Sequence, residues 1–286
     1  MYTTEAQSTQ RRRKSVFSVV NIFKDAKTMN YAHLDELKRR LDGLRPLPPA
    51  VLSNLHEDLV LRWTYNSNAV EGNTLTLKET KVALEGVTIG GKTLREHFEA
   101  LNHRDAIGYI EAVVQNDEPF TAVMIRNVHR LILKNIDDDN AGVWRRFNVT
   151  IAGARHVPPE AFLVPEQMDA LVRWHETDCA GLHPVELAAR THADFVKIHP
   201  FMDGNGRTAR LLMNLDLMRA GFPAIVLPVE QRLEYYEALD TAHVEGNYEP
   251  FLVLLSELAG KAFEVYFRAV DQGQPDTPPK GLPDVK

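Results

Sequence analysis

The sequence is poor in cysteine, in long apolar runs and in positive charge. Cys179 is the only cysteine among 286 residues, so a disulfide within the chain is excluded. No apolar stretch approaches the ~20 residues that a membrane-spanning helix needs. The net charge of −6 gives no general basic surface for nucleic acid. We therefore expect a soluble, cytoplasmic protein whose partners are neither membranes nor nucleic acids.

Hydrophobic residues make up 44% of the chain, and their spacing is mostly helical. Leu52, Leu55, Leu59 and Trp63 are three or four positions apart, which favours one buried face on a helix. A chain of this length can bury a substantial core. The pattern predicts an all-α fold with helices at 49–70, 74–85, 93–115, 121–134, 165–177, 185–198, 207–219, 230–243 and 248–268.

The two ends of the chain differ in composition from the middle. Four basic residues at 11–14 precede a short apolar run that contains Ser and Asn and lacks a convincing cleavage site, so we predict a mobile arm instead of a signal peptide. The C-terminal end is rich in proline and should be disordered. We predict an arm with a short helix at 1–47, a helical extension at 48–92, a core at 93–268 and a disordered tail at 269–286.

The most informative segment is His-Pro-Phe-Met-Asp-Gly-Asn-Gly-Arg-Thr-Ala-Arg at 199–210. The preceding helix should end at His199, because Pro200 disfavours helical geometry in the residue before it. A second helix should begin at Arg207. This arrangement predicts a loop between two helices, with an imidazole at its start that can accept a proton near neutral pH.

The middle of this segment has the composition of an anion-binding loop. Gly204 and Gly206 flank Asn205 and allow backbone N–H groups to converge on one anion. The N-terminus of the following helix favours negative charge at the same point. Arg207 and Arg210 are three residues apart, so both guanidinium groups can reach the anion. These residues together predict a site for a polyphosphate.

Asp203 is a hard oxygen ligand that suits Mg²⁺ bridging phosphate groups. A different interpretation is a metallohydrolase built from His183, His192, His199 and Asp203, since such clusters bind zinc or iron. That alternative lacks an H-E-x-x-H pattern and leaves the glycines and arginines without a role. The acidic run at 137–139 lacks the other ligands of a calcium loop.

The segment resembles the signature of the Fic family, His-Pro-Phe-x-Asp/Glu-Gly-Asn-Gly/Lys-Arg-x-x-Arg, at every fixed position. Gly206 stands where a kinase-like branch has Lys, which argues against that branch. The resemblance implies a Fic-type helical bundle with a small β-hairpin flap. It also implies transfer of AMP from ATP to a Ser, Thr or Tyr hydroxyl of a protein, with Mg²⁺, or Mn²⁺ as an alternative ion.

Each matching residue receives a role from the resemblance. His199 would be the catalytic base, and Asp203 would hold the metal against the α- and β-phosphates. Arg207 would bind the inner phosphates and Arg210 the γ-phosphate. The ATP-binding residues implied in this way are Gly153, Ala154, Arg155, His156, Asp203, Gly204, Asn205, Gly206, Arg207, Thr208, Ala209, Arg210, Tyr235 and His243. His243 departs from the family, where Asn is usual.

Residues 67–73, Ser-Asn-Ala-Val-Glu-Gly-Asn, resemble the inhibitory motif of the same family, Ser/Thr-x-x-x-Glu-Gly/Asn. The resemblance implies an inhibitory helix within 48–92 that docks on the catalytic core at 93–268. Glu71 would then pair with Arg210 and remove the γ-phosphate site, with Ser67 as the other motif residue. In some relatives this glutamate serves the reverse reaction, removal of AMP, so the protein could be bifunctional.

Residues 145–159 resemble the flap of the family. Val149, Thr150 and Ile151 have strand character and Gly153 can turn the chain back, so a hairpin is predicted. In the family this hairpin registers a target segment as an additional strand. An ordinary turn is the alternative.

Other functions remain open at this stage. The signature determines phosphate handling more firmly than the transferred group, which could be UMP, GMP or phosphocholine. A catalytically silent nucleotide-binding module is a further alternative. Self-modification is plausible at Ser15, Ser18 or Thr28. Homodimers are common among similar proteins, although no sequence feature identifies an interface.

Overall fold

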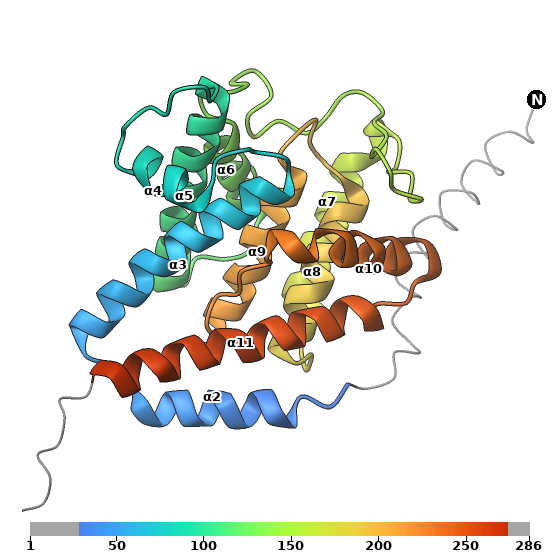
Figure 1. Cartoon of the computed structure of the whole chain (residues 1–286). Helices are drawn as coiled ribbons and strands as arrows, with labels where there is room; N and C mark the ends of the chain where they lie inside the picture. Colours follow the sequence, from blue (N-terminus) through green and yellow to red (C-terminus); the bar gives the residue numbers. More distant parts are fainter. Residues whose placement is uncertain (1–28, 274–286) are drawn as a thin grey trace, which may run out of the picture.

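Helices provide the regular structure of residues 29–273, the part of the chain that the computed structural model describes. No β-strand occurs in this range, which confirms the predicted all-α class. Short 3₁₀ turns lie at Ala161–Leu163 and Val229–Gln231. The α-helices are α2 (Ala32–Leu44), α3 (Pro49–Val70), α4 (Leu77–Leu84), α5 (Leu94–Gln115), α6 (Ala122–Leu133), α7 (Val164–Thr177), α8 (Pro184–Ile198), α9 (Asn205–Arg219), α10 (Arg232–Glu245) and α11 (Glu249–Gly273) (Figure 1).

Capping explains where several helices begin. Thr76 caps α4 and Thr93 caps α5, each through a capping box with the glutamate three residues later. The hydroxyl of each threonine accepts a hydrogen bond from the backbone N–H of Glu79 or Glu96. Because Thr76 is a cap, α4 begins at Leu77 and not at 74 as the apolar spacing predicted. Pro49 occupies the first turn of α3, where its missing N–H is not needed.

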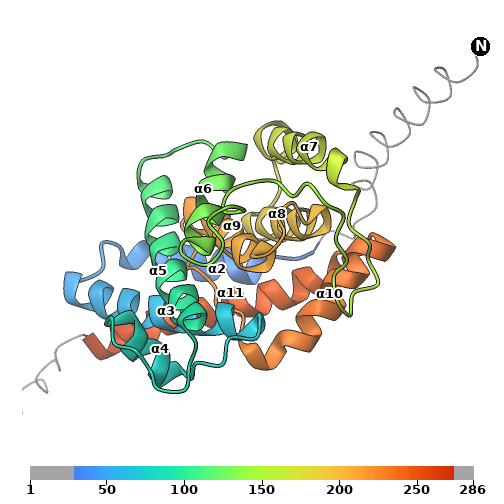
Figure 2. The same ribbon diagram turned by 90° about the horizontal axis from the view of Figure 1, so that it is seen from above.

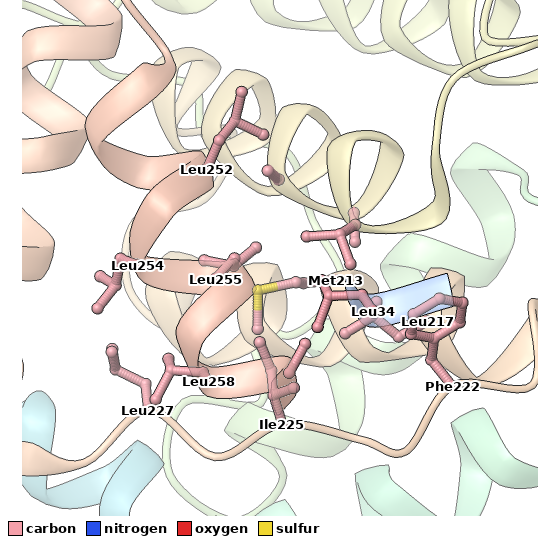
Figure 3. Close-up of a cluster of buried hydrophobic side chains, with 14 of the residues drawn as sticks. Leu34, Met213, Leu217, Phe222, Ile225, Leu227, Leu252, Leu254, Leu255 and Leu258 are labelled. Carbon is pink, nitrogen blue, oxygen red and sulfur yellow. The ribbon is translucent and has the colours of Figure 1, made fainter. Parts of the chain in front are cut away.

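Helices α8 and α9 lie side by side at the centre of the molecule, with the other helices around them (Figures 1 and 2). The core consists of two large apolar clusters on either side of this pair and a small one of Leu75, Ala83 and Ala100. One cluster joins α9 to α2 and α11, where Leu34, Met213, Leu217 and Leu255 meet (Figure 3). The other joins α9 to α3, α5, α6 and α7. The loop between α8 and α9, which carries the signature, is therefore supported by the best-packed helices.

The predicted β-hairpin at 145–159 is not formed. This segment is an irregular loop with one turn, closed by a hydrogen bond from the Ala154 N–H to the Ile151 carbonyl at 3.2 Å. Pro158 and Pro159 have no N–H to donate to a strand partner. A side-chain hydrogen bond joins the two sides of the loop instead, since the Asn148 Oδ1 accepts from the Ala161 N–H at 2.8 Å. Strand propensity at 149–151 was too weak without a partner.

Several predictions about the two ends of the chain fall at or beyond the limits of the described residues. The mobile arm at 11–23, the self-modification sites Ser15, Ser18 and Thr28, and most of the tail lie outside the described residues. Helix α11 continues to Gly273, past the predicted tail boundary at 269. Within residues 29–273, no helix has both the length and the apolar character required to cross a membrane.

Candidate active site

His199 lies directly after the last residue of α8 in a left-handed conformation, with φ 50° and ψ 60°. Such angles are uncommon for a residue other than glycine and store backbone strain. Three hydrogen bonds hold it there. The His199 N–H donates to the Phe195 carbonyl, the Arg145 Nε–H donates to the His199 carbonyl at 2.8 Å, and the Arg145 N–H donates to the Pro200 carbonyl at 2.8 Å. Arg145 therefore holds the backbone at His199 and Pro200.

His199 is neutral in the folded protein at physiological pH. Burial lowers the pKa of its imidazole to about 4, and the charge of Arg145 acts in the same direction. The Val196 carbonyl and the Glu71 carboxylate oppose part of this shift. A neutral imidazole at the end of a helix can accept a proton from a hydroxyl group within hydrogen-bonding distance.

The loop after His199 is closed by the side chain of Asn205. Its amide donates to the Phe201 carbonyl and accepts from the Phe201 N–H, both at 2.9 Å. Gly204 caps α9 with φ 74°, and a Cβ there would lie 3.2 Å from Ile132 and 3.3 Å from His129. The sequence predicted the glycine requirement, while the Asn205 side chain has a structural role that the sequence did not indicate.

His129 of α6 supports the same loop. Its Nδ1 accepts a hydrogen bond from the Gly142 N–H at 2.9 Å, so its Nε2 carries the proton and donates to the Asp203 carbonyl at 2.9 Å. The ring is stacked on Phe201 with centroids 3.4 Å apart. Burial lowers the pKa of His129 to about 4, which keeps this tautomer neutral. His129 is a supporting residue that sequence analysis missed.

The N-terminus of α9, where the sequence predicts an anion site, has free backbone donors. No side chain caps this helix, and its regular hydrogen bonding begins with the Thr208 N–H donating to the Gly204 carbonyl at 3.0 Å. The N–H groups of the first turn before Thr208 therefore lack helical acceptors, as in phosphate-binding helices. The Glu71 carboxylate lies here, since a Cβ on Gly206 would overlap its Oε1 atom.

Arg210 links this site to the end of α3. Its Nη2 donates to the Glu71 Oε1 and to the Ser67 carbonyl, both at 2.8 Å, and its Nε donates to the Ser67 Oγ at 3.0 Å. Burial alone would lower the pKa of Arg210, but Glu71 beside it and Tyr235 raise it. The guanidinium is thus a buried, fully charged group whose strongest partner is Glu71.

The Asp203 carboxylate points to a cluster of charges beside Arg207. Its Oδ1 accepts from the Gly204 N–H at 2.6 Å and lies 3.3 Å from Arg207 Nη2, while its Oδ2 lies 2.5 Å from Arg95 Nη2. Arg207 also lies 3.2 Å from Glu99. Burial would raise the pKa of the Asp203 carboxyl, but Arg207, the Gly204 N–H and Arg95 lower it overall.

This donor set fits Mg²⁺, which commonly binds one or two carboxylates together with substrate phosphates and waters. A metal site made by the protein alone is a poorer fit, because the described residues contain no group of three His, Cys, Asp or Glu that could hold an ion. His183 is stacked on Tyr31, and His192 bonds to the Tyr235 hydroxyl at 3.1 Å. The metallohydrolase arrangement is therefore not formed.

The remaining predicted residues surround this centre. Tyr235 is buried, and its hydroxyl lies 3.4 Å from Arg210 Nη1. His243 is also buried, with its Nε2 2.8 Å from the Ala193 carbonyl, so one ring nitrogen joins α10 to α8. Thr208 is buried too, and the Ala209 side chain belongs to the apolar core, which leaves Ala209 only its backbone for a ligand.

The turn of the 145–159 loop is held against α8 and α10. The Arg155 N–H donates to Asp240 at 2.9 Å, and its guanidinium pairs with Glu245 at 3.0 Å. The His156 Nε2 lies 2.8 Å from the Lys197 carbonyl, close to His199. Gly153 lies in the turn, which the hydrogen bond from the Ala154 N–H to the Ile151 carbonyl closes, and Val149, Thr150 and Ile151 have no strand pairing.

The fold and this site define a class of all-α proteins in which a loop between two central helices combines a histidine, a carboxylate, a helix end with free backbone N–H groups and two arginines. The Fic/DOC family pattern matches residues 119–217. The structure is similar to a Fic domain containing signaling protein from Bacteroides thetaiotaomicron, with a TM-score of 0.79, 32% identity, and coverage of 84% of this chain and 97% of that chain. The chain belongs to the Fic/DOC family.

Further comparisons agree. Fic-1 from C. elegans matches with a TM-score of 0.77 and 30% identity over 96% of this chain and 79% of that chain. A protein named protein adenylyltransferase Fic from Nematostella vectensis is 36% identical over 245 residues, which is 84% of this chain and 57% of the relative. Its namesake from Drosophila persimilis is 36% identical over 85% of this chain and 48% of the relative. The chain thus spans about half the length of these curated relatives.

Proposed function

We propose that the protein is an autoinhibited adenylyltransferase that moves AMP from ATP to a hydroxyl group of a protein. One observation carries the proposal: the Glu71 carboxylate lies on Gly206 and pairs with Arg210, at the helix end that faces the neutral His199. An anionic side chain at an anion site is what an internal inhibitor of phosphate binding requires. The printed names of the curated relatives support the same chemistry.

In the proposed reaction, His199 accepts the proton of a Ser, Thr or Tyr hydroxyl. The hydroxyl oxygen attacks the α-phosphorus of ATP, the bond to the β-phosphate oxygen breaks, and pyrophosphate leaves. Arg207 holds the inner phosphates and Arg210 the γ-phosphate, so that the α-phosphorus stands in line with the attacking oxygen. Asp203 would hold Mg²⁺, or Mn²⁺ in its place, which neutralises charge on the phosphates.

The inhibition follows from charge and space. Arg210 is buried and cannot leave its partners at Ser67 without rearrangement of α3. With Glu71 on Arg210, a γ-phosphate would meet a carboxylate of like charge at the same point. ATP would then bind in a position from which the hydroxyl cannot attack. The same glutamate could orient a water molecule for removal of AMP, which makes a bifunctional enzyme part of the proposal.

The loop at 145–159 is the proposed docking segment for the target. Arg145 places this loop next to His199, and the backbone of Val149, Thr150 and Ile151 has no strand partner. An extended target segment could pair with this backbone and present its hydroxyl to His199. The target could be another protein or a second copy of this chain.

The decisive experiment is transfer from α-labelled ATP with Mg²⁺ in a host-cell lysate. We compare the wild type with Glu71→Gly and with Glu71→Gly/His199→Ala. We expect strong protein labelling only with Glu71→Gly, because removal of the carboxylate frees Arg210 while loss of the base lowers the rate by roughly 10²–10⁴. Equal labelling by the wild type and Glu71→Gly would contradict autoinhibition.

The alternatives give different results in the same assay. If Glu71→Gly transfers no label from ATP but does so from UTP, GTP or a phosphocholine donor, AMP is not the transferred group. The roles proposed for the site residues would then still hold. Binding of ATP by Glu71→Gly without transfer from any donor would favour a silent nucleotide-binding module. Equal labelling with and without His199 would remove the base from the proposal.

A further inference from the structure

We propose that Arg95 competes with the metal ion for Asp203, and that the Arg95–Asp203 ion pair, here called the metal latch, must open before Mg²⁺ and ATP bind productively. This inference rests on the proposed function, because it takes Asp203 as the metal ligand. It adds a second restraint on the same site, besides the pairing of Glu71 with Arg210.

In the metal latch, the Arg95 guanidinium occupies the position that a metal ion would take on Asp203. Arg95 Nη2 lies 2.5 Å from the Asp203 Oδ2, the oxygen that neither Gly204 nor Arg207 contacts. The other oxygen, Oδ1, already accepts from the Gly204 N–H at 2.6 Å. Oδ2 is therefore the atom best placed for a metal, and Arg95 occupies it.

Glu99 holds Arg95 in position from one turn further along α5. Its Oε1 lies 3.1 Å from Arg95 Nε and 3.2 Å from Arg207 Nη1, so one oxygen joins both arginines. Its Oε2 accepts from the Asn73 amide at 2.9 Å. Asn73 ends the segment that carries Glu71, so the metal latch and the inhibitory segment share a contact.

Charge repulsion prevents Arg95 and a metal ion from binding the Asp203 Oδ2 at the same time. A divalent ion on Oδ2 would stand within the same few ångströms as the Arg95 guanidinium, and like charges at that distance repel. Arg95 can move away, because 54% of its side chain is exposed. Exposed ion pairs are weak, so we expect the metal latch to lower the affinity for metal by about two- to fivefold and not to abolish binding.

The test measures Mn²⁺ binding by its electron paramagnetic resonance signal, with the full chain and a non-hydrolysable ATP analogue, in wild type and Arg95→Gln. We expect Arg95→Gln to bind Mn²⁺ about two- to fivefold more tightly. Arg39→Gln is the charge-matched control, since Arg39 is exposed on α2, pairs with Glu36 of the same helix, and α2 packs against α11. Its affinity should equal that of the wild type within error.

The other outcomes overturn the proposal in different ways. Equal affinity in wild type and Arg95→Gln would mean that Arg95 does not compete, and weaker binding in Arg95→Gln would mean that it contacts the phosphates instead. An equal gain in Arg39→Gln would assign the effect to net charge alone. Absence of Mn²⁺ binding in every variant would remove Asp203 as the metal ligand and the metal latch with it, whereas AMP transfer by Glu71→Gly would still stand or fall by its own assay.

Discussion

At the scale of single residues, the site depends on two positions whose backbone is left-handed, His199 and Gly204. Both lie in the loop between the central helices, one as a histidine whose backbone is held by Phe195 and Arg145 and one as a glycine, which adopts this conformation without a Cβ penalty. The difference has a simple cause. His199 must carry a side chain for proton transfer, whereas Gly204 lies against Ile132 and His129 with no room for one.

Gly204→Ala should therefore destabilise the protein. The substitution places a Cβ in a left-handed conformation and 3.2 Å from Ile132, and we expect a loss of about 1–3 kcal/mol in the free energy of unfolding. Urea unfolding measures this change. Gly108→Ala in α5 is the matched control, because no atom lies within 4 Å of the added Cβ, and it should stabilise by about 0.5–1 kcal/mol. An unchanged or increased free energy of unfolding in Gly204→Ala would contradict the steric argument.

At the scale of the elements, α5 matters as much as the signature loop, since its first turns bring Arg95 and Glu99 to the site. The helix is set in position by the capping box of Thr93 and Glu96. Hydrogen bonds from Thr74 and Thr93 lower the pKa of the Glu96 carboxyl to about 2. Glu96 therefore ties the start of α5 to the segment that follows Glu71.

Thr93→Ala should cost about 0.5–2 kcal/mol of stability, because the backbone N–H of Glu96 loses its acceptor. Thr93→Ser retains the hydroxyl and should lie close to the wild type. Thermal and urea unfolding of the two variants measure the difference. Similar losses in Ala and Ser would show that the methyl group of Thr93, and not its cap, carries the effect.

The helices and loops differ in how well their bounds and conformation could be predicted from the sequence. Helices with a continuous apolar face, such as α6 and α8, were predicted within a residue or two of their ends. The loop at 145–159 was predicted wrongly as a hairpin, because local strand propensity does not reveal whether a pairing partner exists. The supporting contacts to the site were missed because they are remote in sequence: Arg145 and His199 are 54 residues apart, and Arg95 and Asp203 are 108 apart.

At the scale of the whole molecule, the interior contains several neutral histidines. Burial is the largest cause of the low pKa values of five of them. It lowers the pKa of His129, His199 and His243 to about 4 and those of His103 and His192 well below the ordinary value. Each joins two helices or lies at the site, so their neutral state is part of the packing.

Stability should fall on acidification. In the unfolded chain the histidine pKa is about 6.5, so between pH 6.5 and about 4 the unfolded state binds protons that the folded state does not. The free energy of unfolding is therefore largest above pH 6.5 and decreases as the pH falls through this window. Asp194, whose pKa burial raises, acts in the opposite direction as a single group. Urea midpoints between about pH 7.5 and pH 5 measure this, and an unchanged or rising midpoint at the lower pH would contradict it.

The place of Glu71 has a consequence for how the protein responds to mild perturbation. The groups proposed for catalysis lie on the loop between α8 and α9 and on the first turns of α9, two helices that contribute to both large apolar clusters, whereas Glu71 lies after the last turn of α3 with a third of its side chain exposed (34%). Helix ends open at lower free energy than packed centres. Partial opening of the end of α3, by mild heating or by a ligand that binds α3, would therefore separate Glu71 from Arg210 before the catalytic groups lose their positions. The protein would then gain activity at temperatures below its global unfolding.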